Sequence, residues 1–577
     1  MKNLLTENID IWTSVQIQKN GNGRGNGSAN QSHYGIKKLR ELILELAVRG
    51  KLVPQDPSDE PASVLLEKIA KEKARLIKEG KIKKQEPLPE IKEEEKPFEL
   101  PEGWAWGRLG DITNYGILDK VEPDDAEEHT WILELEDIEK ETSKVLQKVR
   151  YIDRKFQSSK NRFYKGDVIY GKLRPYLDKV IIADEDGFCT TEMIPFKGYK
   201  FIKAEYLRLV MKSPYFIQYA DESTHGMNLP RLGTDKARLA VLPMVCEQEQ
   251  HRIVAKVDEL MAFCGQLEQK QTDNNALHQT LVETLLSTLT SAANSLEFSE
   301  AWQRIACHFD TLFATEKSID QLKQTILQLA VMGKLVPQNP NDEPASELLE
   351  KIAKEKERLI KEGKIKKEKP LPEIGEEDAP FDLPRGMVWE RLQSLTFLLG
   401  DGLHGTPSYT PGTSYYFING NNLSNGRIDI KSNTKTVSLG EMQKHRKCLS
   451  PNSVLVSING TLGNVAFYNG EEIILGKSAC YFNLTEYVSK YFVKIIIESE
   501  YFKKYALRKA TGSTIKNLSL EAMNCFPVPL PPLAEQHRIV AKVDELMKIC
   551  DKLKALIKEA QTTQIQLADA IVEQAVA

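Results

Sequence analysis

Several features that mark common protein classes are missing from this chain of 577 residues. Its eight cysteines include no C-x-x-C pair, and its nine histidines never stand at the spacing of metal ligands. We therefore expect no disulfide framework and no structural zinc, and a reducing cytoplasm as the compartment. No run of 18 apolar residues is present, which argues against a membrane span, and Glu7 and Asp10 argue against a signal peptide.

The motifs of common catalytic sites are also missing. Residues 470–478 resemble a phosphate-binding loop, but five residues separate Gly470 from Gly476 where the motif needs four. We find no G-x-G-x-x-G fingerprint, and no Asn/Asp-Pro-Pro-aromatic tetrapeptide of the kind expected in an amino-methyltransferase that flips its base. We therefore expect a chain that is not an enzyme and that itself binds no cofactor or metal.

Charge is nearly balanced overall but not locally. The formal net charge is −4 and the pI is near 6.2. Residues 144–179 hold 11 basic and 3 acidic side chains, and residues 387–533 hold 15 basic and 10 acidic ones. Basic faces of this kind are needed for phosphate contacts, although ordinary protein surfaces also carry them. The charge pattern therefore permits nucleic-acid binding without requiring it.

The chain contains a long internal repeat. The segment from Gly50 to Ile91 matches the segment from Gly333 to Ile374 at 36 of 42 positions without a gap. A second block, EQHRIVAKVDELM, occurs at residues 249–261 and is unchanged at residues 535–547. The duplication predicts two like scaffolds related by a pseudo-two-fold repeat.

Two segments of nearly equal length and little shared sequence lie between the repeated blocks. Their aromatic and β-branched residues predict two compact α/β domains, and the whole chain an α+β fold. Two like scaffolds with unlike inserts indicate a molecule that recognises two different things. The expected parts are a helical region with a connector at 1–103, a first variable domain at 104–245, a long helix at 246–292, a second helical region with a connector at 293–386, a second variable domain at 387–533 and a final long helix at 534–577.

Apolar spacing and end signals predict the helices. Helices are expected at 36–48 and 319–331, each followed by a glycine, and the next pair opens at Pro61 and Pro344. Shorter helices are expected near 204–213 and 486–505. Strands are expected within 163–170 and 449–456, each after a turn. The Lys-rich stretch 78–84 is either a nucleic-acid patch or a solvated helix end.

The block EQHRIV opens a long helix in each copy. Steps of four and three from Ile539 meet apolar residues at nine of ten positions, which indicates a coiled-coil seam. The first copy follows the same register to Leu281 and Leu285 but has three polar residues in the middle: Gln271, Asn274 and His278. We expect the two long helices to pair as an antiparallel coiled coil within the chain, with pairing between separate chains as the alternative.

This combination resembles the specificity (S) subunit of type I restriction-modification enzymes over nearly the whole chain. The resemblance rests on apolar-proline stretches that lead into EQHRIVAKVDEL, as at residues 526–536, and on the repeated GKLVPQ and LLEKIAKEK blocks, which look most like the IB subfamily. The first copy departs from the pattern at residues 244–247, where Met-Val-Cys-Glu replaces Pro-Pro-Leu-Ala.

The resemblance implies a noncatalytic, cytoplasmic DNA-binding protein of a bacterium or archaeon. Its two target-recognition domains would each read one half of a bipartite, asymmetric double-stranded DNA target, and the long helices would set the spacer. Two modification subunits with S-adenosylmethionine would methylate adenine, and two restriction subunits with ATP and Mg²⁺ would translocate and cleave. The target bases and the spacer length cannot be read from the sequence.

Base readout requires polar side chains on loops, with cations for phosphate beside them. In the first domain the candidate loops are 170–176, where Arg174 suits guanine and Lys172 suits phosphate or a base, and 224–231. Their counterparts are 457–463 and 511–516. The candidate contacts are Lys172, Arg174, Tyr176, His225, Asn228, Arg231, Asn459, Thr461, Ser513, Thr514 and Lys516. For any single residue, an ordinary surface turn remains the alternative, and His225 has no partner for a general-base role.

Two rival functions remain open. A catalytic methyltransferase or nuclease would require an active-site motif, and none of the motifs considered above is present. A coiled-coil scaffold with two protein-binding domains would bind partners without preference for a DNA sequence.

Overall fold

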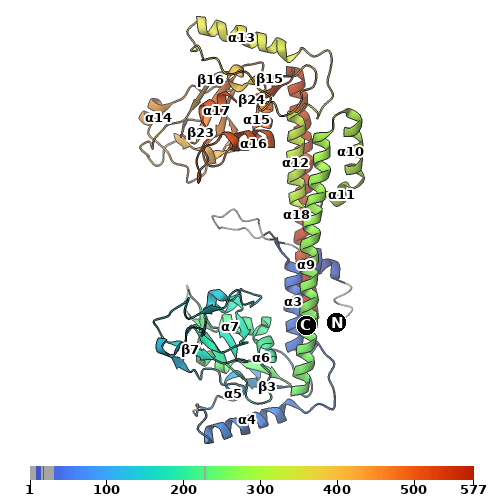
Figure 1. The fold of residues 1–577 in the computed structure, drawn as a ribbon, viewed down its shortest axis with the longest axis vertical. Coiled ribbons are helices and arrows are strands. Elements are labelled where there is room, and N and C mark those ends of the chain that lie inside the picture. The colour runs from blue at the N-terminus through green and yellow to red at the C-terminus, as the bar shows by residue number, and fades with distance from the viewer. Residues whose placement is uncertain (1–7, 15–16, 19–30, 83, 226–228, 577) are drawn as a thin grey trace. The chain divides into compact units, whose positions relative to one another are not determined.

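The chain forms two compact units in a computed structural model that describes residues 8–14, 17–18, 31–82, 84–225 and 229–576. Unit 1 comprises Met1–Asn274 and Ala560–Ala577, and unit 2 comprises Asn275–Glu559. Helix α9 (Glu247–Ser291) begins in unit 1 and ends in unit 2, and α18 (Leu533–Val576) begins in unit 2 and ends in unit 1 (Figure 1). Each unit therefore contains parts of both long helices.

The repeated helices form where the sequence predicts them. Helix α3 (Tyr34–Val48) and helix α12 (Glu316–Val331) end beside Gly50 and Gly333, whose φ angles of 69° and 67° lie in the left-handed region. Helices α4 (Ala62–Lys78) and α13 (Ala345–Lys361) have identical lengths and bury the same three apolar positions on one face. The remaining helices of these regions are α2 (Ile9–Ser14), α10 (Ser295–Cys307) and α11 (Phe309–Leu312).

The variable segment of unit 1 contains two larger sheets. Strand β8 (Val168–Gly171) lies between β11 (Met193–Phe196) and β9 (Val180–Ile182), antiparallel to both. The second sheet has the order β4-β7-β10-β5-β6, in which β10 and β5 run parallel. Its strands are β4 (Lys120–Val121), β7 (Lys160–Phe163), β10 (Gly187–Cys189), β5 (Trp131–Leu133) and β6 (Val149–Arg150).

The two ends of this segment pair with each other. Strand β3 (Ala105–Arg108) is antiparallel to β14 (Val241–Met244), which leads directly into α9. The domain is therefore an insertion closed at its base by its own entry and exit strands. Its helices are α5 (Leu109–Ile112), α6 (Ala204–Met211), α7 (Pro214–Glu222) and α8 (Thr234–Leu239).

The variable segment of unit 2 repeats this plan. Strand β20 (Ser453–Ser457) lies between β23 (Ala479–Leu484) and β21 (Val465–Phe467), with β16 (Thr396–Asp401) beyond β23. A separate parallel pair joins β17 (Tyr416–Ile418) to β22 (Ile473–Leu475), as β5 joins β10 in unit 1. Strand β15 (Val388–Arg391) pairs with β24 (Pro527–Leu530). The remaining elements include β18 (Leu423–Ser424), β19 (Arg427–Ile428), α14 (Leu439–His445), α15 (Lys490–Glu498), α16 (Glu500–Lys509) and α17 (Leu520–Asn524).

The predicted α+β class with two α/β domains and long helices is confirmed. One prediction needs correction, because residues 486–505 do not form a single helix. Helix α15 ends at Glu498, and the Ser499 hydroxyl accepts a hydrogen bond from the Phe502 backbone N–H as the N-cap of α16. The same break separates α6 from α7 at Ser213.

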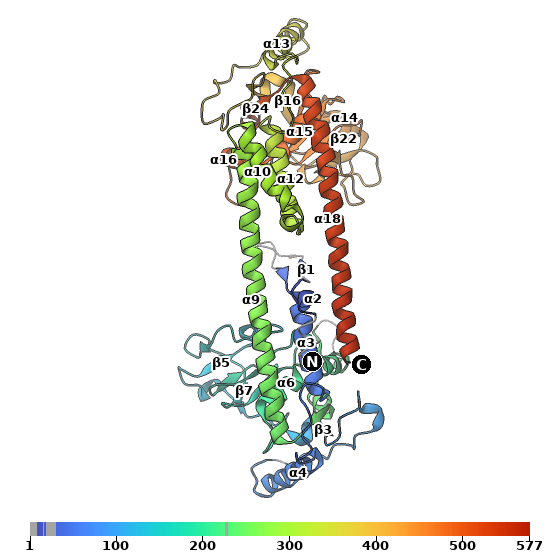
Figure 2. The same cartoon turned by 90° about the vertical axis from the view of Figure 1, so that its right-hand side faces the viewer.

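Helices α3 and α12 pack against both long helices. In unit 1, α3 runs alongside both α9 and α18 (Figure 2). The Arg40 guanidinium of α3 lies 2.7 Å from the Glu268 carboxylate of α9, and the Tyr34 hydroxyl donates to Asp569 of α18. In unit 2 the Gln321 side chain of α12 donates to Glu283 of α9, and Lys554 of α18 donates to Asp320 of α12. These shorter helices therefore cover the apolar seams of α9 and α18 within each unit.

The predicted seam shifts by one residue in the second half of each long helix. Leu281 of α9 is 50% exposed and Leu567 of α18 is 46% exposed, whereas their neighbours Val282 and Ala568 are buried. A strict heptad drifts by about 20° per heptad on a straight helix, so four heptads accumulate close to one residue. The apolar face follows the helix period, and the heptad positions late in each helix were predicted wrongly.

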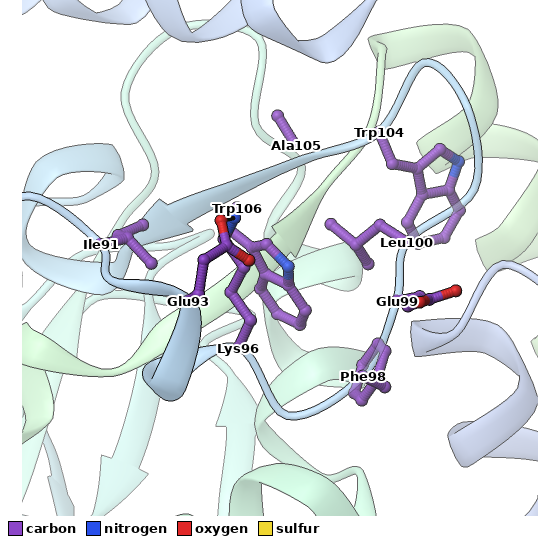
Figure 3. Close-up of a pocket in the computed structure, with 9 residues that line it drawn as sticks. All are labelled: Ile91, Glu93, Lys96, Phe98, Glu99, Leu100, Trp104, Ala105 and Trp106. Atoms are coloured by element: carbon purple, nitrogen blue, oxygen red, sulfur yellow. Dashed lines mark hydrogen bonds and ion pairs between the residues drawn. The ribbon is translucent and has the colours of Figure 1, made fainter.

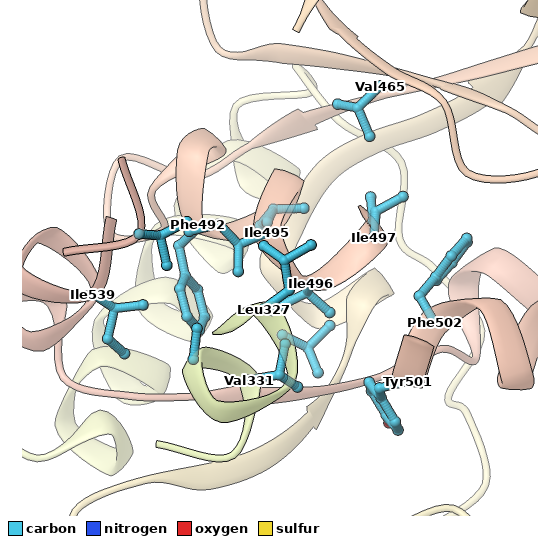
Figure 4. Close-up of a cluster of buried hydrophobic side chains, with 14 of the residues drawn as sticks. Leu327, Val331, Val465, Phe492, Ile495, Ile496, Ile497, Tyr501, Phe502 and Ile539 are labelled. Carbon is cyan, nitrogen blue, oxygen red and sulfur yellow. The ribbon is translucent and has the colours of Figure 1, made fainter. Parts of the chain in front are cut away.

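A continuous apolar core joins the variable domain of unit 2 to its helices. Leu327 and Val331 of α12 lie beside Phe492 and Ile496 of α15, and Ile539 of α18 lies in the same cluster (Figure 4). Burying each such side chain contributes about 1.5–3 kcal/mol. The variable domain of unit 2 is therefore packed onto its helices. Of the helices that the structure describes, none is both long and apolar enough to cross a bilayer.

Candidate nucleic-acid interface

Three loops of unit 1 meet at one edge of the variable domain. Loop A (172–178) follows β8, and loop B (190–192) joins β10 to β11. Loop C comprises the paired strands β12 (Thr224–His225) and β13 (Arg231–Leu232) with Leu229 and Pro230. The Lys172 N–H donates to the Glu192 carbonyl at 3.0 Å, which joins loop A to loop B. The Arg174 N–H donates to the Pro230 carbonyl at 2.7 Å, which joins loop A to loop C.

The equivalent three loops of unit 2 meet in the same way. Loop A is 458–464, loop B is 476–478 and loop C is 511–517. The Ile458 N–H donates to the Ser478 carbonyl at 2.9 Å, and the Gly460 N–H donates to the Lys516 carbonyl at 2.9 Å. The Asn459 side chain also donates to the Asn517 side chain at 3.0 Å. Each unit therefore presents one small surface composed of three loops.

Most of the candidate residues lie on these two surfaces. In unit 1, Arg174 and Tyr176 are exposed, Lys172 is half-buried, and a backbone bridge joins Leu173 to Arg231. The candidate His225 lies in β12 opposite Arg231, and Asn228 lies outside the described residues. In unit 2 the exposed candidates are Thr461, Ser513, Thr514 and Lys516. Asn459 of loop A is half-buried against loop C. The paired loops proposed from the sequence are thus brought together in both units.

Sequence reasoning missed loop B, which carries opposite charge in the two units. In unit 1 its Glu192 carboxylate lies 3.1 Å from Nε of Arg231, so that guanidinium is already paired. In unit 2 loop B carries the exposed Lys477, within the stretch that resembles a phosphate-binding loop. The sequence did not place loop B beside loops A and C, because this depends on the pairing of β11 with β8 and of β23 with β20. Arg174 is the exposed cation on the described part of the unit 1 surface. Its guanidinium forms no ion pair or hydrogen bond with the described residues.

Loop A has left-handed backbone at two positions in each unit. In unit 1 these are Arg174 and Asp178, with φ of 53° and 49°, and in unit 2 they are Gly460 and Gly463, with φ of 78° and 85°. Arg174 and Gly460 are equivalent because each donates its N–H to a loop C carbonyl. A non-glycine residue in this conformation costs about 1–2 kcal/mol, and such strain is found at functional sites. Unit 1 therefore holds side chains where unit 2 uses glycine.

A buried ion pair lies at the far end of loop A in unit 1. The Asp178 carboxylate accepts from Nζ of Lys212 at 2.6 Å, and the two side chains are 12% and 11% exposed. Burial raises the pKa of Asp178 to about 6, although Lys212 opposes the shift. Burial likewise lowers the pKa of Lys212, and Asp178 opposes that change. The pair is thus held against a substantial desolvation penalty.

Within the part of the chain that the structure describes, one group of side chains has the chemistry of metal ligands, and it lies in unit 1 at the start of α9. Oxygen and sulfur atoms of Asp59, Cys246 and Glu249 lie within 4.8 Å of one another. Asp59 is already paired with the Arg252 guanidinium, and the Glu249 carboxylate accepts from the Trp104 indole at 3.1 Å. Burial raises the pKa of both Cys246 and Glu249. These contacts favour a salt-bridged helix start over an ion site.

A recess of about 700 Å³ lies beside the connector of unit 1 (Figure 3). Its lining residues all come from Ile91 to Trp106. The Phe98 ring packs edge-on against Trp106 at 5.0 Å, and Phe381 and Trp389 repeat this pair in unit 2 at 4.9 Å. The aromatic pair beside the recess therefore belongs to the repeated scaffold, whereas the loop surfaces belong to the variable domains.

Comparisons with known proteins agree with this division of the chain. Residues 407–562 match the family described as the type I restriction modification DNA specificity domain. The type I restriction enzyme EcoAI specificity subunit of Escherichia coli is 41% identical over 597 residues, covering 100% of both chains. The EcoEI specificity subunit of the same species is 37% identical over 594 residues, covering 100% of this chain and 99% of that one.

A solved structure on complex assembly and conformational transition of the type I R-M system contains a chain with the same fold. It aligns with a TM-score of 0.50 and 19% identity, over 83% of this chain and 99% of that chain. The full-length identities carry the assignment of family, and the structural likeness agrees with the fold. The chain belongs to the family of type I restriction enzyme specificity subunits.

Proposed function

We propose that this chain selects the DNA sequence on which a type I restriction-modification complex acts. Each variable domain reads one half of a bipartite, asymmetric target through its three-loop surface. The observation that carries the proposal is that both units place loops A, B and C together on the same strand framework while bearing different side chains. A common framework with different loop residues is what two unrelated half-sites require.

The catalytic steps belong to partner chains in this proposal. Two modification subunits bind S-adenosylmethionine and methylate adenine, and two restriction subunits use ATP and Mg²⁺ to translocate and cleave DNA. The specificity chain works in the cytoplasm, where its DNA lies. Support comes from the family assignment and from the many scaffold residues that are identical in the two copies.

The proposal is tested by mapping methylated adenine in cells that co-express this chain with a modification subunit of its family. We expect methylation at one split, asymmetric motif that disappears when this chain is omitted. Co-purification of the two proteins without any motif would reject sequence selection and favour the scaffold alternative.

A further inference from the structure

We propose that the Asp178–Lys212 ion pair is a positioning device that holds Arg174 at the tip of loop A, so that the first variable domain reads a base pair through this arginine. The inference rests on the proposed function, since it assigns a task to residues behind the reading surface. Asp178 and Lys212 are positioning residues here, and Arg174 is the residue that contacts DNA.

Lys212 fixes the end of loop A through several contacts. It follows the last turn of α6, and its ammonium donates to the Asp178 carboxylate at 2.6 Å, to the Ser143 hydroxyl at 2.8 Å and to the Glu141 carbonyl at 3.0 Å. The Ser143 hydroxyl in turn donates to the Asp178 carbonyl at 2.6 Å. Hydrogen bonds to both its side chain and its backbone therefore hold Asp178 in place.

A single turn transmits this constraint to Arg174. The Asp178 N–H donates to the Pro175 carbonyl at 2.9 Å, and the Leu177 N–H donates to the Arg174 carbonyl at 2.9 Å. From the other side, the Arg174 N–H donates to the Pro230 carbonyl of loop C. Both ends of the turn, Arg174 and Asp178, are left-handed, so the turn is strained and needs external contacts to persist.

Unit 2 lacks every charged part of this device. Gly463 stands in place of Asp178, and Gly460 stands in place of Arg174. Glu498 stands in place of Lys212, because each directly precedes the serine that caps the next helix. Glu498 pairs with Lys494 on its own helix at 2.6 Å. Where the arginine is absent, the aspartate and the lysine are absent as well, as expected if the three act together.

The environment of Gly463 explains why unit 2 does without the device. A Cβ atom built there would lie 3.3 Å from the Ile497 carbonyl and 3.3 Å from the Phe502 ring. Glycine makes the same turn without strain, and Gly460 leaves the tip of loop A without a side chain. The second surface therefore reads DNA without a loop A cation.

The test is a selection from a pool of random DNA duplexes, using the full chain co-purified with its modification subunit. In the wild type, one base pair of the half-site read by unit 1 should depend on Arg174. Lys212→Met should lower the preference at that base pair about tenfold, and Asp178→Asn should act in the same direction. The half-site read by unit 2 should not change. A variant that failed to fold would also lose its preference at the half-site read by unit 2. Retained preference there therefore shows that the variant is folded.

A double-mutant cycle separates positioning from general stability. In an Arg174→Gly background the turn is unstrained and the reading side chain is gone, so Lys212→Met should cause no further change in preference at this base pair. Lys494→Met, which breaks the corresponding pair in unit 2, is the matched control and should leave both half-sites unchanged. Lys212→Arg should restore at least part of the preference because it keeps a cation near Asp178.

Two results would overturn the inference. One is an unchanged preference in Lys212→Met, and the other is an equal further loss from Lys212→Met in the wild-type and Arg174→Gly backgrounds. In either case the wild type would still select a bipartite motif, and the proposed function would stand. If the wild type itself selects no motif, the proposed function fails, which is a distinct outcome.

Discussion

The two variable domains use one framework in two ways. Both close their ends with an antiparallel strand pair, both carry a parallel strand pair, and both bring loops A, B and C together. They differ at the loop tips, where unit 1 has an exposed arginine in strained backbone and unit 2 has glycine. The comparison shows that the residues at the loop tips differ while the strand framework is kept, which is what the proposed function requires of a scaffold that serves two targets.

Charge is distributed differently over the two surfaces. Among the described residues of the unit 1 surface, the exposed cation is Arg174 on loop A, whereas Arg231 of loop C is paired with Glu192 of loop B. Unit 2 has glycine at the tip of loop A and exposed lysines, Lys477 and Lys516, on loops B and C. A cation that approaches a groove from a different loop meets a different base edge or phosphate. The two half-sites should therefore differ in the position as well as the identity of the bases read.

The largest expected effects test the shared framework. Phe216 and Phe502 are fully buried, and each lies three residues after the serine that caps its helix. Phe216→Ala or Phe502→Ala should lower the free energy of unfolding by about 3–5 kcal/mol, since each leaves a cavity. Hydrogen exchange measured peptide by peptide should show the greater loss in the unit that carries the change. Equal losses in both units from either variant would contradict separate cores.

The next effect concerns the reading of DNA by Arg174. Arg174→Ala should reduce discrimination at one base pair by about 1–3 kcal/mol, because a bidentate contact to guanine would be lost. Binding to the wild-type target and to single-base variants, measured at fixed salt, checks this. Lys516→Ala serves as the counterpart in unit 2 and should affect only the other half-site. A uniform loss over all sequences would make Arg174 a phosphate contact.

A smaller effect concerns the backbone of loop A. Arg174→Gly should raise the free energy of unfolding of unit 1 by about 1 kcal/mol, and Gly460→Ala should lower that of unit 2 by a similar amount. Gly463→Ala should cost more than Gly460→Ala, because a Cβ at Gly460 meets open space whereas one at Gly463 meets Ile497 and Phe502. Local hydrogen exchange of loop A measures these changes. The reverse order of the two glycine variants would show that the space around Gly463 is not limiting.

The smallest effect is a pH dependence that Asp178 gives to unit 1 and that its counterpart Gly463 cannot give to unit 2. The pKa of Asp178 is raised to about 6 in the folded chain, above its ordinary value of 3.8. As the pH falls, the Asp178 carboxylate of the folded chain therefore takes up a proton before that of the unfolded chain does. This uptake raises the free energy of unfolding as the pH falls through about 6, and the gain is lost as the pH rises through about 6. Relative to Asp178→Asn, the wild type should gain about 1 kcal/mol between about pH 7 and about pH 5. A difference that does not change over this interval would contradict the raised pKa.

The scaffold could be predicted from the sequence because its signals are local. Proline at the first turn located the starts of α4 and α13 to within a residue, and apolar spacing with a following glycine located α3 and α12. The late part of the long-helix seam was predicted wrongly because Leu281 and Leu567 fit a heptad, whereas the helices keep their own period.

The three-loop surfaces could be predicted only in part. Turn residues and basic side chains indicated loops A and C. Their equivalent positions in the two domains matched each loop of unit 1 with its counterpart in unit 2. Three features depended on contacts between residues far apart in the sequence: the Arg231–Glu192 pair, the Asp178–Lys212 pair and the position of Lys477. The left-handed backbone of Arg174 could not be predicted either, because arginine has no preference for this conformation. Glycine adopts it readily, so Gly460 and Gly463 carry a signal for it in the sequence.

The most direct test of the central claim is to exchange residues 104–245 for the corresponding segment of a relative and to map methylated adenine again. The account predicts that one half of the split motif changes completely while the other half is unchanged. The reciprocal exchange of residues 387–533 should change the other half alone. If either exchange alters both halves of the motif, the two domains do not read DNA independently and the account is wrong.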